Sequence, residues 1–194
     1  MKMSASIYSN KNKKFNDLIK ELDLFNVDFF HIDCNDDLSV FNDIEVIRKN
    51  SITPIDLHII SDKPEKYYSG IIKNNIELVT FQFENLTKNI EIPSDISSKF
   101  GLALMTDTPI EVFDDFADRF SFVLFMTTTP GESGGKFDKR NFDKIKEFKK
   151  KYPEKFAHVD GGVNDEVAFV LRSLGVSCAV SGCSGPLILD TFQA

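Results

Sequence analysis

Histidines and aspartates alternate with apolar residues in three short segments of the chain. These segments read His31-Ile-Asp33, Asp56-Leu-His58 and His158-Val-Asp160. Alternate residues of a β-strand point to the same face of a sheet, so each segment would present two polar side chains on one face. Imidazole nitrogens and carboxylate oxygens form a mixed ligand set that suits zinc, iron(II), manganese or cobalt. The pattern makes His31, Asp33, His58 and Asp160 candidate ligands of one divalent ion.

A second interpretation of these residues needs no metal. A strand histidine is more often a hydrogen-bonded core residue, and a carboxylate at the end of a strand often caps the following helix. The chain has only 3 histidines, and all of them are expected to point inward near the ends of strands. This coincidence favours a shared site, but the spacing alone leaves both interpretations open.

Three glycine-rich segments form a second group of candidate binding residues. They are Thr129–Gly135, Asp160–Gly162 and Ser181–Pro186, and each follows a predicted strand. Glycines let backbone N–H groups approach an anion closely, and the second segment leads into a helix N-terminus, where the helix dipole favours phosphate. Ordinary turns would explain any one segment. Three in succession favour a phosphate site, which neutral amides can form even in an acidic protein.

These residues need a scaffold that brings the ends of several strands together. Eight strand candidates follow one another at 3–8, 28–34, 54–60, 78–83, 101–105, 121–126, 156–160 and 177–181. Helices are expected between them at 13–25, 41–48, 65–74, 109–116, 141–151 and 165–174. This alternation predicts an α/β fold, the (β/α)8 TIM barrel, which keeps its active site at the C-terminal ends of its strands. A doubly wound open sheet is the alternative.

Two helices of this barrel are expected to be incomplete. Residues 85–99 should hold the fourth helix, but Pro93 and a poor periodicity predict a short or broken one. After Ser184 only residues 185–194 remain, too few for a full helix at 1.5 Å per residue. We expect a compact barrel with a shortened or missing eighth helix. The side of the barrel without its eighth helix would be open or covered by another subunit, so a homo-oligomer is expected.

Length and charge narrow the class of protein. The chain has 194 residues, of which 42% are hydrophobic, and this fits a single domain over 1–194. Its net charge is −7 and no basic block accompanies aromatic residues, which argues against nucleic acid as a partner. The apolar stretches are far shorter than the roughly 20 residues of a membrane span. Without an apolar signal core at the N-terminus, we expect a cytoplasmic protein with no membrane partner.

Segments spread over most of the chain carry a resemblance to a known family. They are Ser4–Ile7, His31–Asp36, Asp56–His58, Phe125–Thr127, Pro130–Gly131, Gly134, Lys136–Phe137, Val159–Val163 and Val180–Gly182. Together they resemble the ribulose-phosphate 3-epimerase family. The resemblance implies a barrel in which His31, Asp33, His58 and Asp160 hold one divalent metal ion, with zinc expected first and Fe(II), Mn or Co as alternatives. It also implies that Asp33 and Asp160 are the two acid/base catalysts.

The resemblance extends to the residues around the substrate. It implies a substrate site containing Ser6, His58, Met126, Gly131, Ser133, Gly134, Gly161, Gly162, Gly182 and Cys183, with the glycine loops on the phosphate. The segment Asn35–Ser39 departs from the usual lid of the family, and Glu132 and Ser133 replace residues of its phosphate loop.

The function expected from the resemblance is an isomerase reaction of the pentose phosphate pathway. A metal-dependent 3-epimerase would interconvert D-ribulose 5-phosphate and D-xylulose 5-phosphate by two-carboxylate proton transfer through an enediolate. The changed lid favours an alternative, a 3-epimerase of another sugar phosphate such as a hexulose 6-phosphate. The short C-terminus and altered phosphate loop favour a non-catalytic sugar-phosphate-binding relative, although the intact histidine and aspartate set counts against it.

Overall fold

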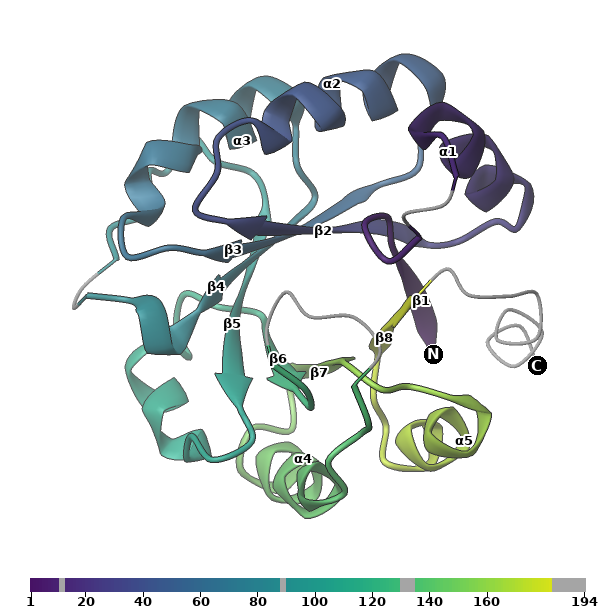
Figure 1. The fold of residues 1–194 in the computed structure, drawn as a ribbon. Helices are drawn as coiled ribbons and strands as arrows, with labels where there is room; N and C mark the ends of the chain where they lie inside the picture. Colours follow the sequence, from purple (N-terminus) through teal and green to yellow (C-terminus); the bar gives the residue numbers. More distant parts are fainter. Residues whose placement is uncertain (11–12, 88–89, 130–134, 183–194) are drawn as a thin grey trace.

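The computed structural model describes residues 1–10, 13–87, 90–129 and 135–182 (Figure 1). Within these residues, eight parallel strands follow one another around a closed barrel, and the first pairs with the last. The strands are β1 (Lys2–Ser6), β2 (Phe29–Asn35), β3 (Ile55–Ile60), β4 (Leu78–Gln82), β5 (Lys99–Met105), β6 (Phe122–Met126), β7 (Phe156–Asp160) and β8 (Cys178–Gly182). The predicted TIM barrel is confirmed, and its closure excludes the open sheet.

Helices surround the strands (Figure 1). The α-helices are α1 (Phe15–Leu24), α2 (Val40–Asn50), α3 (Tyr68–Asn74), α4 (Arg140–Lys151) and α5 (Asp165–Ser173). Shorter 3-10 helices are η1 (Pro64–Tyr67), η2 (Phe83–Asn85) and η3 (Ile110–Asp115). Helix α1 buries Leu18, Ile19 and Leu22, which recur at helical spacing on its inner side. Among the described residues, every helix is too short or too polar to cross a membrane.

Two predicted helices differ from the structure. The described part of the connection between β4 and β5 holds only η2, so the prediction of a broken helix over 85–99 still gave too much helix; Pro93 cannot donate a helical hydrogen bond. The helix predicted at 109–116 is the 3-10 helix η3 instead. Asp114 and Asp115 put negative charge at its C-terminal end, where a helix dipole is already negative, and this disfavours an α-helix.

The region of the expected eighth helix lies outside the described residues, which stop at 182. Its shortening or absence therefore stays a prediction.

The barrel has an apolar layer on each side of its strands. Outward residues such as Phe30, Ile32 and Leu57 are buried in the main core beneath the helices. Inside the barrel, the first residues of alternate strands form an apolar layer at the N-terminal end; they are Phe29, Leu78, Phe122 and Cys178. This arrangement of four side chains from alternate strands is typical of TIM barrels. It fills the N-terminal end of the barrel interior, so the polar inward side chains lie toward the C-terminal end.

Candidate metal centre and active site

The four candidate ligands meet inside the barrel near the C-terminal ends of its strands. His31 Nε2 lies 3.4 Å from Asp33 Oδ1 and 3.7 Å from Asp160 Oδ2. His58 Nδ1 lies 3.1 Å from Asp33 Oδ1, and one ligand atom from each of the four residues lies within 4.8 Å of the others. Ligand atoms about 2.0–2.2 Å from one ion lie about 3–4 Å from each other. The group could therefore hold a divalent metal ion.

Three strands position these ligands. His31 and Asp33 are two residues apart on β2, so both point inward while Phe30 and Ile32 pack outward. The parallel register sets His58 of β3 beside Asp33. Asp160 is the last residue of β7, which is not a neighbour of β2 or β3 in the barrel. Asp33 and Asp160 therefore approach the barrel axis from different sides.

His31 has one ring nitrogen in the position of a metal ligand. On one side of the ring, Nδ1 donates a hydrogen bond to Asp56 Oδ2 at 2.9 Å. On the other side, Nε2 is buried and has no hydrogen-bond partner among the described residues. A buried polar atom without a partner costs free energy. A cation between Asp33 and Asp160 would satisfy this nitrogen.

Asp56 is a site residue to which the sequence analysis assigned no role. Its side chain is almost fully buried, and Oδ2 accepts hydrogen bonds from Ser4 Oγ at 2.8 Å and from His31 Nδ1. A carboxylate behind a ligating imidazole fixes the orientation of the ring and raises the basicity of its free nitrogen. Asp56 has the same strand parity as His58, and this signal could have identified it.

Burial and charge move the pKa values of the two catalytic candidates apart. Burial raises the pKa of Asp33, but the adjacent imidazoles of His31 and His58 outweigh burial and hold this pKa below its usual range. Burial and the charge of Asp33 raise the pKa of Asp160 to about 6, against the opposing effect of the imidazoles. The side chains of Asp33 and Asp160 are 17% and 16% exposed, so both can meet a ligand at the C-terminal end of the barrel. Divergent pKa values suit an acid and a base.

The charges around His31 also suit a cation. Burial lowers the pKa of His31, but Asp56 and Asp33 outweigh burial and raise it well above its ordinary value. The same negative charges that attract a proton to His31 attract a metal ion, and the two would compete for Nε2.

His158 does not join this group, although it points into the barrel. Its ring stacks on Phe122 with ring centroids 4.3 Å apart. Burial lowers the pKa of His158 to about 4, so the ring is neutral at pH 7. His158 lies in the middle of β7, and unlike His31 and His58 it contacts the apolar N-terminal layer, through Phe122.

The other residues predicted around the substrate lie at the same end of the barrel where the structure describes them. Ser6 and Gly182 end neighbouring strands and are paired in register. Met126 ends β6 beside Asp160 and is buried among Ala103, Leu124 and Val180. Gly131, Ser133, Gly134 and Cys183 lie outside the described residues, so their predicted roles stay predictions.

The turn after β7 requires its two glycines. Gly161 and Gly162 have φ values of 110° and 59°, a conformation that other residues rarely adopt. A Cβ on Gly162 would lie 2.2 Å from the backbone nitrogen of Phe137, so the turn also packs too closely for a side chain. The turn leads to α5, where Asn164 Oδ1 accepts a hydrogen bond from the Val167 N–H at 2.9 Å. The predicted helix N-terminus is therefore present beside the site.

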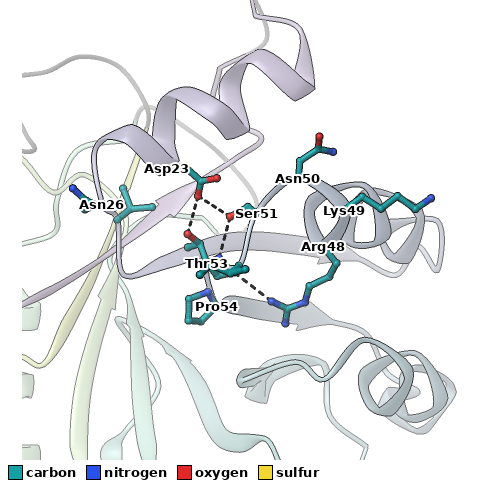
Figure 2. Close-up of a pocket in the computed structure, with 10 residues that line it drawn as sticks. Asp23, Asn26, Arg48, Lys49, Asn50, Ser51, Thr53 and Pro54 are labelled. Carbon is teal, nitrogen blue, oxygen red and sulfur yellow. Dashed lines mark hydrogen bonds between the residues drawn. The ribbon is translucent and has the colours of Figure 1, made fainter.

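An open hollow of about 700 Å³ lies at the opposite end of the molecule (Figure 2). Its lining comes from the segments that precede β2 and β3. Figure 2 shows its polar groups bonded to one another: Asp23 accepts from Ser51 and Thr53, and Arg48 donates to the Thr53 carbonyl. In TIM barrels this N-terminal end serves stability.

The chain matches the Ribulose-phosphate 3 epimerase family over residues 2–184. It is 30% identical to "Ribulose-phosphate 3-epimerase" of Bacillus subtilis, with 94% of this chain and 90% of that protein covered. It is 27% identical to the protein of the same name from Schizosaccharomyces pombe, with 92% and 82% covered.

Solved structures agree on the fold at much lower identity. Phosphoribosyl anthranilate isomerase from Thermus thermophilus matches with a TM-score of 0.70 at 9% identity, covering 100% of this chain and 98% of that one. A tryptophan synthase α-subunit from Pyrococcus furiosus matches with a TM-score of 0.64 at 15% identity, covering 94% and 86%. These matches support the barrel alone, whereas the sequence matches identify the family. The chain belongs to the ribulose-phosphate 3-epimerase family, a family of isomerases.

Proposed function

We propose that this chain is a metal-dependent 3-epimerase that interconverts D-ribulose 5-phosphate and D-xylulose 5-phosphate. The observation that carries the proposal is the convergence of His31, Asp33, His58 and Asp160 toward the C-terminal end of the barrel, with ligand atoms within 4.8 Å of one another. The names of the relatives support the substrate, since they describe ribulose-phosphate 3-epimerases.

The same four residues would hold the ion, through His31 Nε2, His58 Nδ1 and one oxygen of each carboxylate. Buried His31 Nε2, which has no hydrogen-bond partner among the described residues, fits this role. A divalent ion bound there supplies positive charge that stabilises negative charge on substrate oxygens. The donor set suits zinc first, and also Fe(II), Mn or Co.

Asp33 and Asp160 would carry the protons. Epimerisation at C3 removes a proton beside the C2 carbonyl and returns one to the opposite face of the planar enediolate. One of the two carboxylates accepts the C3 proton, and the other, protonated, donates a proton to the opposite face. The reverse reaction exchanges these roles. Because the two carboxylates come from β2 and β7, the substrate need not turn over in the site.

The remaining predicted residues would orient the sugar phosphate. Ser6 and Met126 lie at the strand ends that flank the ligand group, next to His31 and Asp160 in the strand register. Phosphate would bind among backbone amides of the glycine segments, which include Gly161, Gly162 and Gly182 and, outside the described residues, Gly131, Ser133, Gly134 and Cys183. Anchoring the phosphate fixes C3 between the two carboxylates.

The test is exchange of the C3 proton with solvent in a panel of ketose phosphates, with the metal content of the same sample measured in parallel. We expect metal-dependent exchange and epimerisation of D-ribulose 5-phosphate, with lower kcat/KM for hexulose 6-phosphates. A higher kcat/KM for a hexulose phosphate would replace the proposed substrate. Absence of exchange with every sugar phosphate in metal-loaded protein would contradict the epimerase itself.

A further inference from the structure

Each of the two ring nitrogens of His58 lies next to an oxygen atom of another side chain. Nδ1 lies 3.1 Å from Asp33 Oδ1, within the ligand group, and Nε2 lies 2.9 Å from Gln82 Oε1. A neutral imidazole has one N–H and one free lone pair, so only one nitrogen can serve as a metal ligand at a time. The neighbour of Nε2 therefore decides whether Nδ1 is available to the ion.

Gln82 is held in one orientation by Glu84. The Gln82 side-chain amide donates from Nε2 to Glu84 Oε2, and an ionised carboxylate can only accept. Glu84 is anchored in turn, because its Oε1 accepts from the Met105 N–H at 2.9 Å and from the Thr108 hydroxyl. With its nitrogen turned to Glu84, Gln82 must present its oxygen to His58. This oxygen requires a hydrogen on His58 Nε2.

We propose that Gln82 and Glu84 are positioning residues that hold His58 in the form with Nε2 protonated and Nδ1 directed to the metal. The inference rests on the proposed metal site and extends it to two residues that do not touch the ion. Gln82 is almost fully buried on β4, and Glu84 lies just after this strand at the C-terminal end of the barrel. The relay runs from the β5 backbone through Glu84 and Gln82 to His58.

The protonated nitrogen can be identified directly by NMR of zinc-loaded protein labelled with 15N-histidine. The chain has only 3 histidines, which simplifies assignment. We expect His58 to show a solvent-protected Nε2–H and a metal-bound Nδ1. A protonated Nδ1 with a metal-bound Nε2 would overturn the inference.

Variants of the relay should weaken zinc binding. Gln82→Leu removes the acceptor at similar volume, and loss of such an outer partner costs about 10–100-fold in metal affinity. The matched control is Thr80→Val, because Thr80 is buried on the same inward face of β4 and its hydroxyl has no hydrogen-bond partner in the described structure. We expect Thr80→Val to keep the wild-type zinc Kd. Equal zinc Kd values for Gln82→Leu and wild type would overturn the inference.

Glu84→Gln tests whether Glu84 sets the orientation of the Gln82 side-chain amide, and it leaves the barrel interior unchanged. Its new amide can donate toward Gln82, so Gln82 would turn over and present its NH2 group to His58. We expect about a tenfold higher zinc Kd and loss of the hydrogen from His58 Nε2, consistent with the usual effect of outer partners. Asp107→Asn, which removes an exposed negative charge just after β5, is the control for charge alone. An equal rise in Kd for both variants would contradict the relay.

These results separate the relay from the proposed function. Failure of the wild type to bind zinc would overturn the metal site and the relay with it. Wild-type zinc affinity and epimerase activity in folded Gln82→Leu and Glu84→Gln would overturn the relay alone.

Discussion

His31 and His158 have the same side chain inside the same barrel, but their surroundings give them different roles. Nδ1 of His31 is bonded to Asp56, and its Nε2 faces two further carboxylates. His158 stacks on an apolar ring, and burial keeps it neutral. The negatively charged carboxylates around His31 attract a metal cation more strongly than the neutral phenyl ring beside His158 does.

This difference predicts the effect of replacing each histidine on metal content. His31→Ala should bind less than one tenth of the wild-type zinc at a zinc concentration near the wild-type Kd, since a lost ligand removes more affinity than the roughly 10–100-fold of an outer partner. His158→Asn is the control and should keep the wild-type zinc content. Elemental analysis after gel filtration measures both. An unchanged zinc content in His31→Ala would exclude it as a ligand.

Residue types and strand parity could predict the four candidate ligands, because alternation along a strand assigns His31, Asp33, His58 and Asp160 to inward faces. Parity could not separate the ligand His58 from Asp56, which shares its parity on β3 but is hydrogen-bonded to His31. It also gave no reason to select Gln82, whose contact with His58 depends on the register of β4 against β3. Such contacts arise from packing between strands distant in sequence.

At the scale of elements, strands were more predictable than the connections between them. The alternation of apolar runs located all eight strands of the described chain to within a few residues. The connections after β4 and β5 did not follow the pattern, since they contain 3-10 turns where α-helices were expected. A short connection can cover the barrel with isolated apolar residues such as Phe113, which is fully buried, without a regular helix.

Helix α5 depends on its cap at Asn164. The Asn164 side chain accepts from the Val167 N–H, which no backbone carbonyl within the helix can reach. Asn164→Ala should lower the free energy of unfolding by about 1 kcal/mol, the usual cost of losing a cap. Urea denaturation measures this free energy. Asn164→Asp, which keeps a hydrogen-bond acceptor, should have a free energy of unfolding close to that of the wild type. Equal midpoints for wild type and Asn164→Ala would mean that the cap does not stabilise the helix.

At the scale of the whole molecule, the ligand group joins β2 and β3 to β7 across the barrel. An ion that binds only the folded barrel should stabilise the entire chain. At a free zinc concentration 100 times the Kd, the free energy of unfolding should rise by about 2.7 kcal/mol. Thermal unfolding of metal-free protein with and without zinc measures this. A similar rise in His31→Ala would show that zinc acts elsewhere.

The central claim is that Asp33 and Asp160 work from opposite sides of the substrate, and epimerisation in heavy water by Asp160→Asn tests it most directly. The variant keeps the shape of the side chain but removes a proton carrier, so the rate of epimerisation should fall by about 10²–10⁴-fold. With metal content confirmed in the same sample, deuterium should still enter C3 of only one epimer, the one whose proton faces Asp33. Near wild-type epimerisation by metal-loaded Asp160→Asn, or deuterium entry into both epimers, would contradict the account.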